Sequence, residues 1–209
     1  MTAVDKSDLV RAGALLRRGD RVLLALGDLD KWLLTSSGIC IPVTGIAGSR
    51  RANETMAERA RLAFRETTGA EAELRHSRVT FLDIDGELTR ETFPTPVAPI
   101  LYQIRQPQPE IRIHVGVFLA ESGAEPQPAD VPGLLWAPLA AIDRLAQGVR
   151  YRDLRALHVE LLANESIPDD AEFRLEVPGP EQLIPRIVGE FGPGALAASP
   201  ANRGRCRKS

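Results

Sequence analysis

Residues Gly48–Ala70 read GSRRANETMAERARLAFRETTGA, and the rest of the chain is best understood from this stretch. From Glu54 to about Thr68 it contains neither Gly nor Pro and is rich in Ala, Arg and Glu, which predicts a helix. Gly69 follows as a natural stop, because glycine readily adopts the left-handed conformation common after a helix. The stretch therefore predicts a loop, a helix and a glycine that ends it.

Strand-like segments lie on both sides of this helix. Arg11–Leu26 contains two apolar runs around Arg17–Asp20, which predicts a hairpin, and Asp85–Gly86 is a typical hairpin turn further along. Further strands are expected at residues 39–48, 98–105 and 111–121, the last of them largely apolar and therefore central. The pattern predicts an α/β fold with a mixed sheet flanked by helices.

After Gly148 the sequence pattern changes from strand-like to helical. Residues 134–147 are expected to run from a short strand into a helix. Beyond them, residues 152–165 have an amphipathic helical pattern, and residues 181–191 have a weaker one interrupted by Pro185. The predicted organisation is a flexible N-terminus (1–9), an α/β domain (10–148), a C-terminal helical extension (149–191) and a disordered tail (192–209).

Composition excludes several classes of protein. The net charge of −2 gives no global positive field, so neither nucleic acid nor an anionic membrane is an expected partner. The chain has no N-terminal apolar run of signal-peptide type and no run near 18 apolar residues, which predicts a cytoplasmic protein. Its 2 cysteines and 3 histidines show neither a disulfide framework nor zinc spacing. P-loop and serine-hydrolase motifs are absent from the sequence.

The order of elements and the opening stretch together resemble the Nudix family. Its motif is G-x5-E-x7-R-E-U-x-E-E-x-G-U, where U is aliphatic, and Gly48, Glu54, Glu66 and Gly69 stand at matching positions. The segments HVGVFLAE and VPGLLWAPLAAI downstream fit the family as well, so the resemblance covers about residues 10–148. An upstream IPVTG offers Gly45 as an alternative first glycine of the motif.

The resemblance implies an α/β/α sandwich that hydrolyses a nucleoside diphosphate linked to another moiety, with Mg²⁺ or Mn²⁺ held by carboxylates on the motif helix. Leu62 and Ala63 replace the motif's Arg-Glu pair, and Thr67 replaces the second paired glutamate. Two of the three metal-ligand glutamates are therefore missing. Glu66 and Glu54 remain as catalytic candidates, and Glu66 and Glu58 remain as metal-ligand candidates.

Other residues could complete or replace such a site. Additional carboxylates are available in the hairpin at Asp83, Asp85, Glu87 and Glu91, although solvated side chains are the commoner outcome there. Arg59 lies one helical turn before Ala63 and adds positive charge where a cation would sit. The predicted substrate-binding residues are Arg50, Arg51, Trp32 and Arg59, and Tyr102 could line the same cleft or simply pack.

Two functions remain open from sequence. The first is a metal-dependent hydrolase with weak or lost activity. The second is a module that binds a nucleotide or ADP-ribose-type ligand without cleaving it, so the cofactor is Mg²⁺ or Mn²⁺, or none. The expected partner is a nucleoside diphosphate-type small molecule, and the C-terminal extension could mediate a homodimer.

Overall fold

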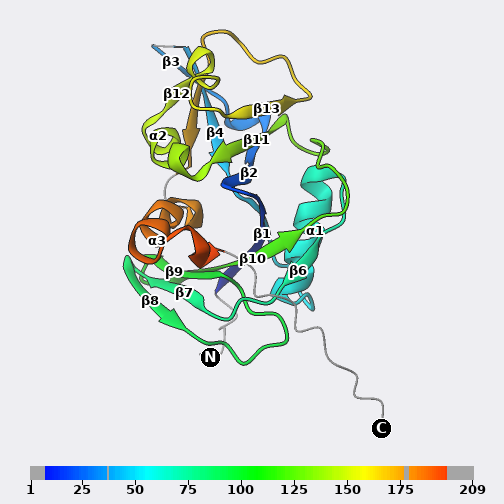
Figure 1. Cartoon of the computed structure of the whole chain (residues 1–209), viewed down its shortest axis with the longest axis vertical. Helices are drawn as coiled ribbons and strands as arrows, with labels where there is room; N and C mark the ends of the chain where they lie inside the picture. Colours follow the sequence, from blue (N-terminus) through cyan, green and yellow to red (C-terminus); the bar gives the residue numbers. More distant parts are fainter. Residues whose placement is uncertain (1–7, 37, 177–178, 197–209) are drawn as a thin grey trace.

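The computed structural model describes residues 8–36, 38–176 and 179–196. Within these residues, 14 strands form two sheets that continue into one another through the β1–β2 hairpin, and helices cover both sides (Figure 1). The expected α/β class with a mixed sheet is confirmed, because parallel and antiparallel pairs occur side by side.

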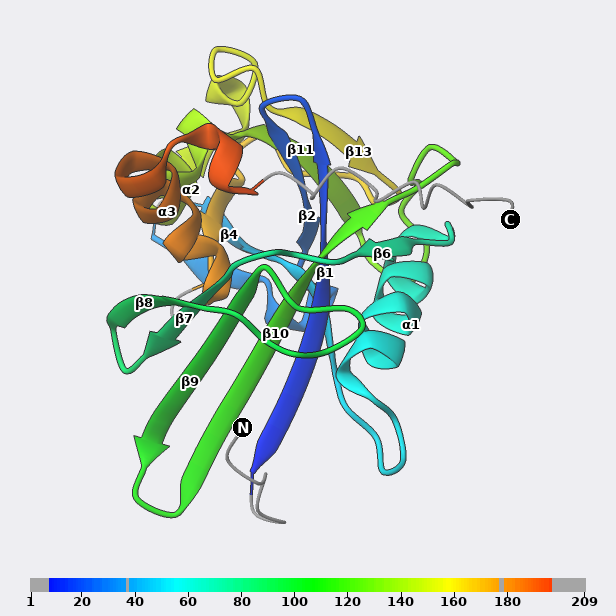
Figure 2. The same cartoon turned by 60° about the horizontal axis from the view of Figure 1, so that its bottom comes forward.

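The first sheet is built around β1. This strand pairs in parallel with β10 along eight residues and antiparallel with β5, while β10 continues the sheet to β9, β7 and β8. Figure 2 shows β1, β10 and β9 side by side with α1 beyond β1. The bounds are β1 Leu9–Arg18, β5 Ile46–Ser49, β6 Glu73–Arg75, β7 Thr80–Ile84, β8 Glu87–Glu91, β9 Leu101–Gln108 and β10 Ile111–Glu121.

The second sheet is built around β2. It pairs antiparallel with β4 and β11, and β14 adds to β4 in parallel while β13 adds to β11. Two short strands, β3 and β12, lie at its margin. The bounds are β2 Arg21–Leu26, β3 Leu33–Thr35, β4 Gly38–Thr44, β11 Gly133–Pro138, β12 Val149–Arg150, β13 Glu160–Ala163 and β14 Glu172–Leu175.

Helices bury their apolar faces on opposite sides of β1. Along this strand Leu15 belongs to one apolar cluster, and Ala14 and Leu16 belong to the other, as the alternation of a strand requires. Helix α1 adds Phe64 to the second cluster, whereas α3 adds Ile184 to the first. The helices are α1 Met56–Thr68, α2 Ile142–Gln147 and α3 Leu183–Phe191, with 3-10 turns η1 Leu29–Lys31, η2 Leu139–Ala141, η3 Tyr151–Asp153, η4 Pro180–Gln182 and η5 Pro193–Leu196.

The local signals of the motif stretch and the turns are confirmed. Helix α1 ends at Gly69, whose φ of 65° is the left-handed conformation that glycine adopts without strain. Asp85 and Gly86 both have positive φ, 49° and 98°, as a two-residue turn matched to the twist of a hairpin requires. The Arg17–Asp20 segment closes the β1–β2 hairpin.

The helix expected at residues 152–165 is wrong. The chain there forms the turn η3 and then β13, in which Leu161 and Leu162 pair with Leu135 and Leu134 of β11. Pairing with an available strand outweighs the helical propensity of this segment, which is a weak preference. The expected helix at 181–191 is confirmed as η4 and α3, and Pro185 fits because it lies in the first turn, where N–H groups lack intrahelical acceptors.

Some residues near the two ends of the chain, where flexible or disordered segments were expected, form regular structure. Leu9 already begins β1, and Leu196 in η5 is 1% exposed. Residues 1–7 and 197–209, which include most of the predicted flexible N-terminus and disordered tail, lie outside the described residues. Within the described part, no helix combines the length and apolar character needed to cross a membrane.

Substitution of Phe173 tests whether β14 is an integral part of the hydrophobic core. Its side chain is fully buried, and β14 pairs in parallel with β4. Phe173→Ala is expected to lower the free energy of unfolding by about 3–5 kcal/mol, because it removes an aromatic ring and leaves a cavity. Urea denaturation measures this, with the exposed neighbour Arg174→Ala as the control, expected within about 0.5 kcal/mol of wild type. Equal midpoints for Phe173→Ala and wild type would contradict this placement.

Candidate functional site

Helix α1 begins with a capping box. The backbone N–H and the hydroxyl of Thr55 donate to Oε2 of Glu58 at 2.7 and 2.8 Å, and the N–H of Glu58 donates to the hydroxyl of Thr55. These hydrogen bonds, first of all the one from the Thr55 N–H, lower the pKa of Glu58. Glu58, expected as a metal ligand, therefore serves to start the helix.

Arg59 reaches along the helix to Glu66, the one glutamate left at the motif's ligand positions. Its guanidinium forms an ion pair with Oε2 of Glu66, and the Arg59 side chain is 5% exposed while that of Glu66 is 41% exposed. A Cβ placed on Gly48 would lie 2.6 Å from Nε of Arg59. Gly48 therefore has a clear structural role, which is to leave room for the guanidinium.

These residues do not fit a divalent metal ion. Ala63 is buried and offers no ligand, and Glu66 already has a cation beside it. Glu58 lies eight residues earlier in the helix, about 12 Å along its axis, whereas Mg²⁺ binds its oxygen ligands at about 2.1 Å. No group of three or more His, Cys, Asp or Glu side chains in the described residues could hold a metal.

The additional carboxylates of the hairpin do not join Glu66. Leu82 and Ile84 of β7 line a cavity together with residues of α1, so Asp83 between them faces the opposite side of the sheet. There it is fully buried, accepts a hydrogen bond from Gln103 at 2.8 Å and lies 3.3 Å from Arg105. On the same hairpin Asp85 accepts from the N–H of Gln106 at its exposed end, and Glu87 and Glu91 are exposed on β8.

The loop before α1 is organised by Glu54. Its carboxylate accepts the N–H of Arg51 at 2.9 Å, and Asn53 between them adopts the left-handed conformation with φ 68°. Glu54, expected as a catalytic residue, thus holds the loop. Arg50 and Arg51 are both exposed, but only Arg50 is among the residues that line the neighbouring cavity.

This cavity has a volume of about 720 Å³. Small-molecule sites commonly measure about 300–1,000 Å³. It lies between the start of α1, the first sheet and the β8–β9 loop, which crosses β10 and β1 toward α1 in Figure 2. Its lining is mainly apolar and aromatic, with Phe93, Tyr102 and Phe118, and Arg50 and Arg61 are the cations among its lining residues.

A chain of three polar side chains begins in the cavity wall formed by β9 and β10. The hydroxyl of Tyr102 is 3.0 Å from Nδ1 of His114, and Nε2 of His114 is 3.2 Å from Oδ2 of Asp8. The side chains of His114 and Asp8 are 4% and 6% exposed. Burial raises the pKa of Tyr102, Asp8 adds to the increase and Arg50 opposes it, so Tyr102 is a neutral phenol at neutral pH.

Other predicted site residues lie apart from this cavity. Trp32 donates its indole N–H to the carbonyl of Gly27 at 2.9 Å and packs against the first apolar cluster. Gly45 lies against the carboxyl of Glu181, where a Cβ would clash. Substrate binding by Trp32, Arg51 and Arg59 stays a prediction that the structure does not test, and Arg59 is engaged with Glu66.

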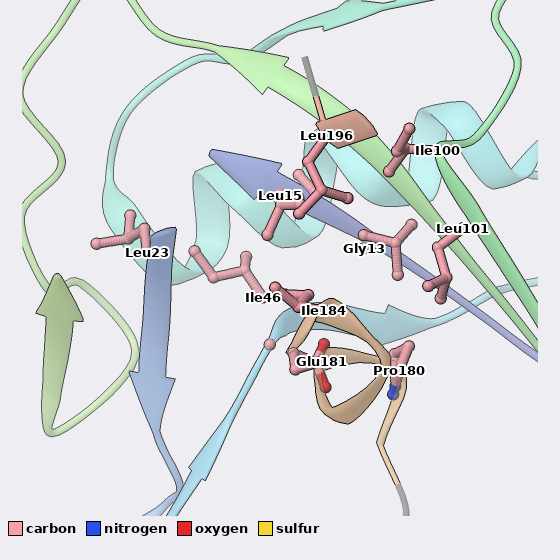
Figure 3. Close-up of a pocket in the computed structure, with 13 residues that line it drawn as sticks. Gly13, Leu15, Leu23, Ile46, Ile100, Leu101, Pro180, Glu181, Ile184 and Leu196 are labelled. Carbon is pink, nitrogen blue, oxygen red and sulfur yellow. The ribbon is translucent and has the colours of Figure 1, made fainter. Parts of the chain in front are cut away.

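Glu181 lies beside a second cavity, of about 20 Å³, lined by β1, β9, Gly45 and the C-terminal segment (Figure 3). The surrounding side chains are mostly apolar, among them Leu15, Leu101 and Ile184. Burial raises the pKa of Glu181, and nearby Glu176 adds to the increase, whereas backbone N–H groups of Glu181 and Gly45 and the charge of Arg11 oppose it. The fold therefore favours the neutral carboxyl.

Several cavity residues escaped the sequence interpretation. His114 is a polar residue within the otherwise apolar strand around residues 113–120, and that break in the pattern was the available signal. Tyr102, which was expected either in the cleft or in packing, does line the cavity, and strand alternation brings the unexpected Ile104 to the same side. Nothing local to the sequence indicates that Phe93 and Arg61 line the same cavity, because this depends on how the β8–β9 loop crosses the sheet.

Comparison with known proteins finds similarity in structure but no significant match in sequence. No protein-family model matches this chain, and no curated protein sequence matches it significantly. The E. coli ORF135 protein shares 14% identity with a TM-score of 0.43, covering 66% of this chain and 79% of that chain. A Nudix-family hydrolase from Clostridium perfringens shares 17% identity with a TM-score of 0.42, covering 67% and 86%. A Nudix hydrolase from Nitrosomonas europaea shares 14% identity with a TM-score of 0.42, covering 90% and 73%.

The buried carboxyl of Glu181 predicts a pH-dependent stability. Because its pKa in the folded protein lies above the ordinary 4.5, the neutral form stabilises the fold below that pH, and this contribution is lost as pH rises through the folded pKa. Glu181→Gln stays neutral throughout. It should therefore raise the melting temperature near neutral pH, and its advantage should shrink as pH approaches 4.5.

Melting temperatures of wild type and Glu181→Gln across this pH range measure the effect. Glu165→Gln, which replaces an exposed carboxylate that does not act on Glu181, is the control and should follow the wild-type profile. Parallel profiles for wild type and Glu181→Gln would show that this carboxyl is as readily ionised in the fold as in the unfolded chain.

Proposed function

We propose that this chain binds a nucleoside diphosphate-type small molecule on a Nudix-type α/β fold and does not hydrolyse it through a bound metal. The observation that carries the proposal is the cavity of about 720 Å³ beside α1, which has an apolar, aromatic lining and arginines among its lining residues. A ligand of matching character has an anionic group at one end and a flat apolar ring at the other.

The anionic group is suited to the side of the cavity formed by α1. Arg50 and Arg61 line this side, and guanidinium groups bind phosphate oxygens through paired charge-assisted hydrogen bonds. Thr55, Met56 and Ala57 at the start of α1 also line the cavity, so the positive end of the helix dipole faces it. Both features favour negative charge in the same place.

The remaining lining suits a ring. Phe93 and Tyr102 lie with their ring centroids 5.8 Å apart, and Phe118 and Ile104 add apolar surface. Stacking of a nucleobase on aromatic side chains contributes about 1–3 kcal/mol per base. Gly116 of β10 matters for the shape of this wall, because a Cβ there would lie 2.5 Å from Cε of Met56.

The motif helix explains why hydrolysis is not proposed. Pyrophosphate cleavage in the family that the motif resembles depends on divalent metals, which neutralise phosphate charge and activate water. Here Arg59 is paired with Glu66, Ala63 is buried, and Asp83 faces the other side of the sheet. The chain retains a place for the ligand while the carboxylates that would hold the metal are missing or engaged.

Binding of ADP and ADP-ribose in the presence of EDTA tests the proposal. Calorimetry with the full chain is expected to show saturable binding without added metal. Arg50→Ala should weaken it by about 10-fold or more, because it removes a charge-assisted hydrogen bond to phosphate. Arg65→Ala is the control: Arg65 is an exposed arginine of α1 that does not line the cavity, and this variant should bind within about twofold of wild type.

Two results would contradict the proposal. Absence of binding by both ligands would remove the binding function. Magnesium-dependent release of AMP from either ligand by the purified chain would show instead that the protein is a hydrolase.

A further inference from the structure

His114 is the most deeply buried polar side chain in the wall of the large cavity. It lies on β10, a central strand, with Tyr102 on the neighbouring β9 and Asp8 next to the start of β1. Its Nε2 is 3.2 Å from Oδ2 of Asp8 and, within the described residues, makes no aligned hydrogen bond, while Nδ1 is 3.0 Å from the Tyr102 hydroxyl. A buried polar chain of this kind limits what the cavity can accept.

The direction of the hydrogen bonds follows from the chemistry of the three groups. A carboxylate only accepts, so we assign the imidazole proton to Nε2, the nitrogen that faces Asp8. Nδ1 of His114 is then the acceptor, and the Tyr102 hydroxyl donates to it. With its one proton used in this way, the phenolic oxygen of Tyr102 has only lone pairs to offer the cavity.

We propose that Tyr102 is a specificity-determining residue of this cavity, which selects ligands whose ring carries an N–H or amino donor at its edge, and that His114 is the residue that positions it. This inference rests on the proposed binding function and adds the class of ring that the cavity prefers. A ring with a carbonyl oxygen at that edge would bring two acceptors together, and a ring with a plain C–H would leave the Tyr102 oxygen without a partner.

The surroundings of Tyr102 support an edge-on contact of this kind. Its side chain is partly buried, lines the cavity and lies beside Phe93, so a ring that stacks on Phe93 lies next to Tyr102. Water is poorly placed to satisfy that oxygen once an apolar ring fills the cavity. A buried acceptor left without a donor costs about 1–3 kcal/mol, which is the source of the selectivity.

A pair of nucleotides that differ only in this donor tests the inference. ADP carries a 6-amino group, and purine riboside 5′-diphosphate has a hydrogen atom in its place, while both keep the same diphosphate and ring system. Calorimetry in EDTA is expected to show ADP binding about 5–10-fold more tightly to the wild-type chain. Tyr102→Phe, which retains the ring, should bring the ratio of the two affinities close to one.

The ratio of the two affinities distinguishes a loss of ring specificity from a loss of folding or of overall binding. Arg61→Ala should weaken both nucleotides and leave their ratio unchanged, because Arg61 lines the cavity from α1, at the proposed anionic end. Equal affinities of both nucleotides for wild type would overturn the inference while the binding function stands, and so would an unchanged ratio in Tyr102→Phe. No binding of either nucleotide would refute the binding function and this inference with it. The wild-type ratio decides the matter even if Tyr102→Phe does not fold.

Discussion

The ion pair between Arg59 and Glu66 is the constraint on which the functional interpretation of this fold depends. Glu66 is the only glutamate that remains at the motif's ligand positions, and a guanidinium already supplies it with positive charge. A metal at Glu66 would have to displace Arg59 and leave a buried cation without its partner, which costs up to about 3–5 kcal/mol in buried pairs. Because Glu66 is partly solvent-exposed, the cost here is lower, yet a single carboxylate offers little binding energy to offset it.

The same constraint links several residues that look unrelated in the sequence. Gly48 has no side chain because the Arg59 guanidinium lies against its backbone. Ala63 is small and buried where a carboxylate would face that guanidinium's site. The helix therefore keeps its cap, its glycine stop and its packing through Phe64, while Glu66 is paired with Arg59 of the same helix. Neither sheet depends on a metal at this helix, because both are held by strand pairing and apolar packing.

Features set by local chemistry could be predicted from the sequence. The helix ending at Gly69, the Asp85–Gly86 turn and the apolar central strand β10 follow from glycine conformation and side-chain periodicity. Features set by distant pairing could not. β13 lies where a helix was expected because β11 offers an edge, and Asp83 lies across the sheet from Glu66 although its sequence position suggested a nearby acid. The cavity itself depends on the course of the β8–β9 loop, which has no periodic signal.

The central claim is that Arg59 takes the place of a divalent cation at Glu66. Titration of the purified full chain with Mn²⁺ or Mg²⁺ by calorimetry, without nucleotide, tests it most directly. The account predicts no saturable binding in the millimolar range, with wild type and Glu66→Gln giving the same heats. Saturable binding by the wild type that disappears in Glu66→Gln would contradict it, because a working ion site would then exist beside the arginine.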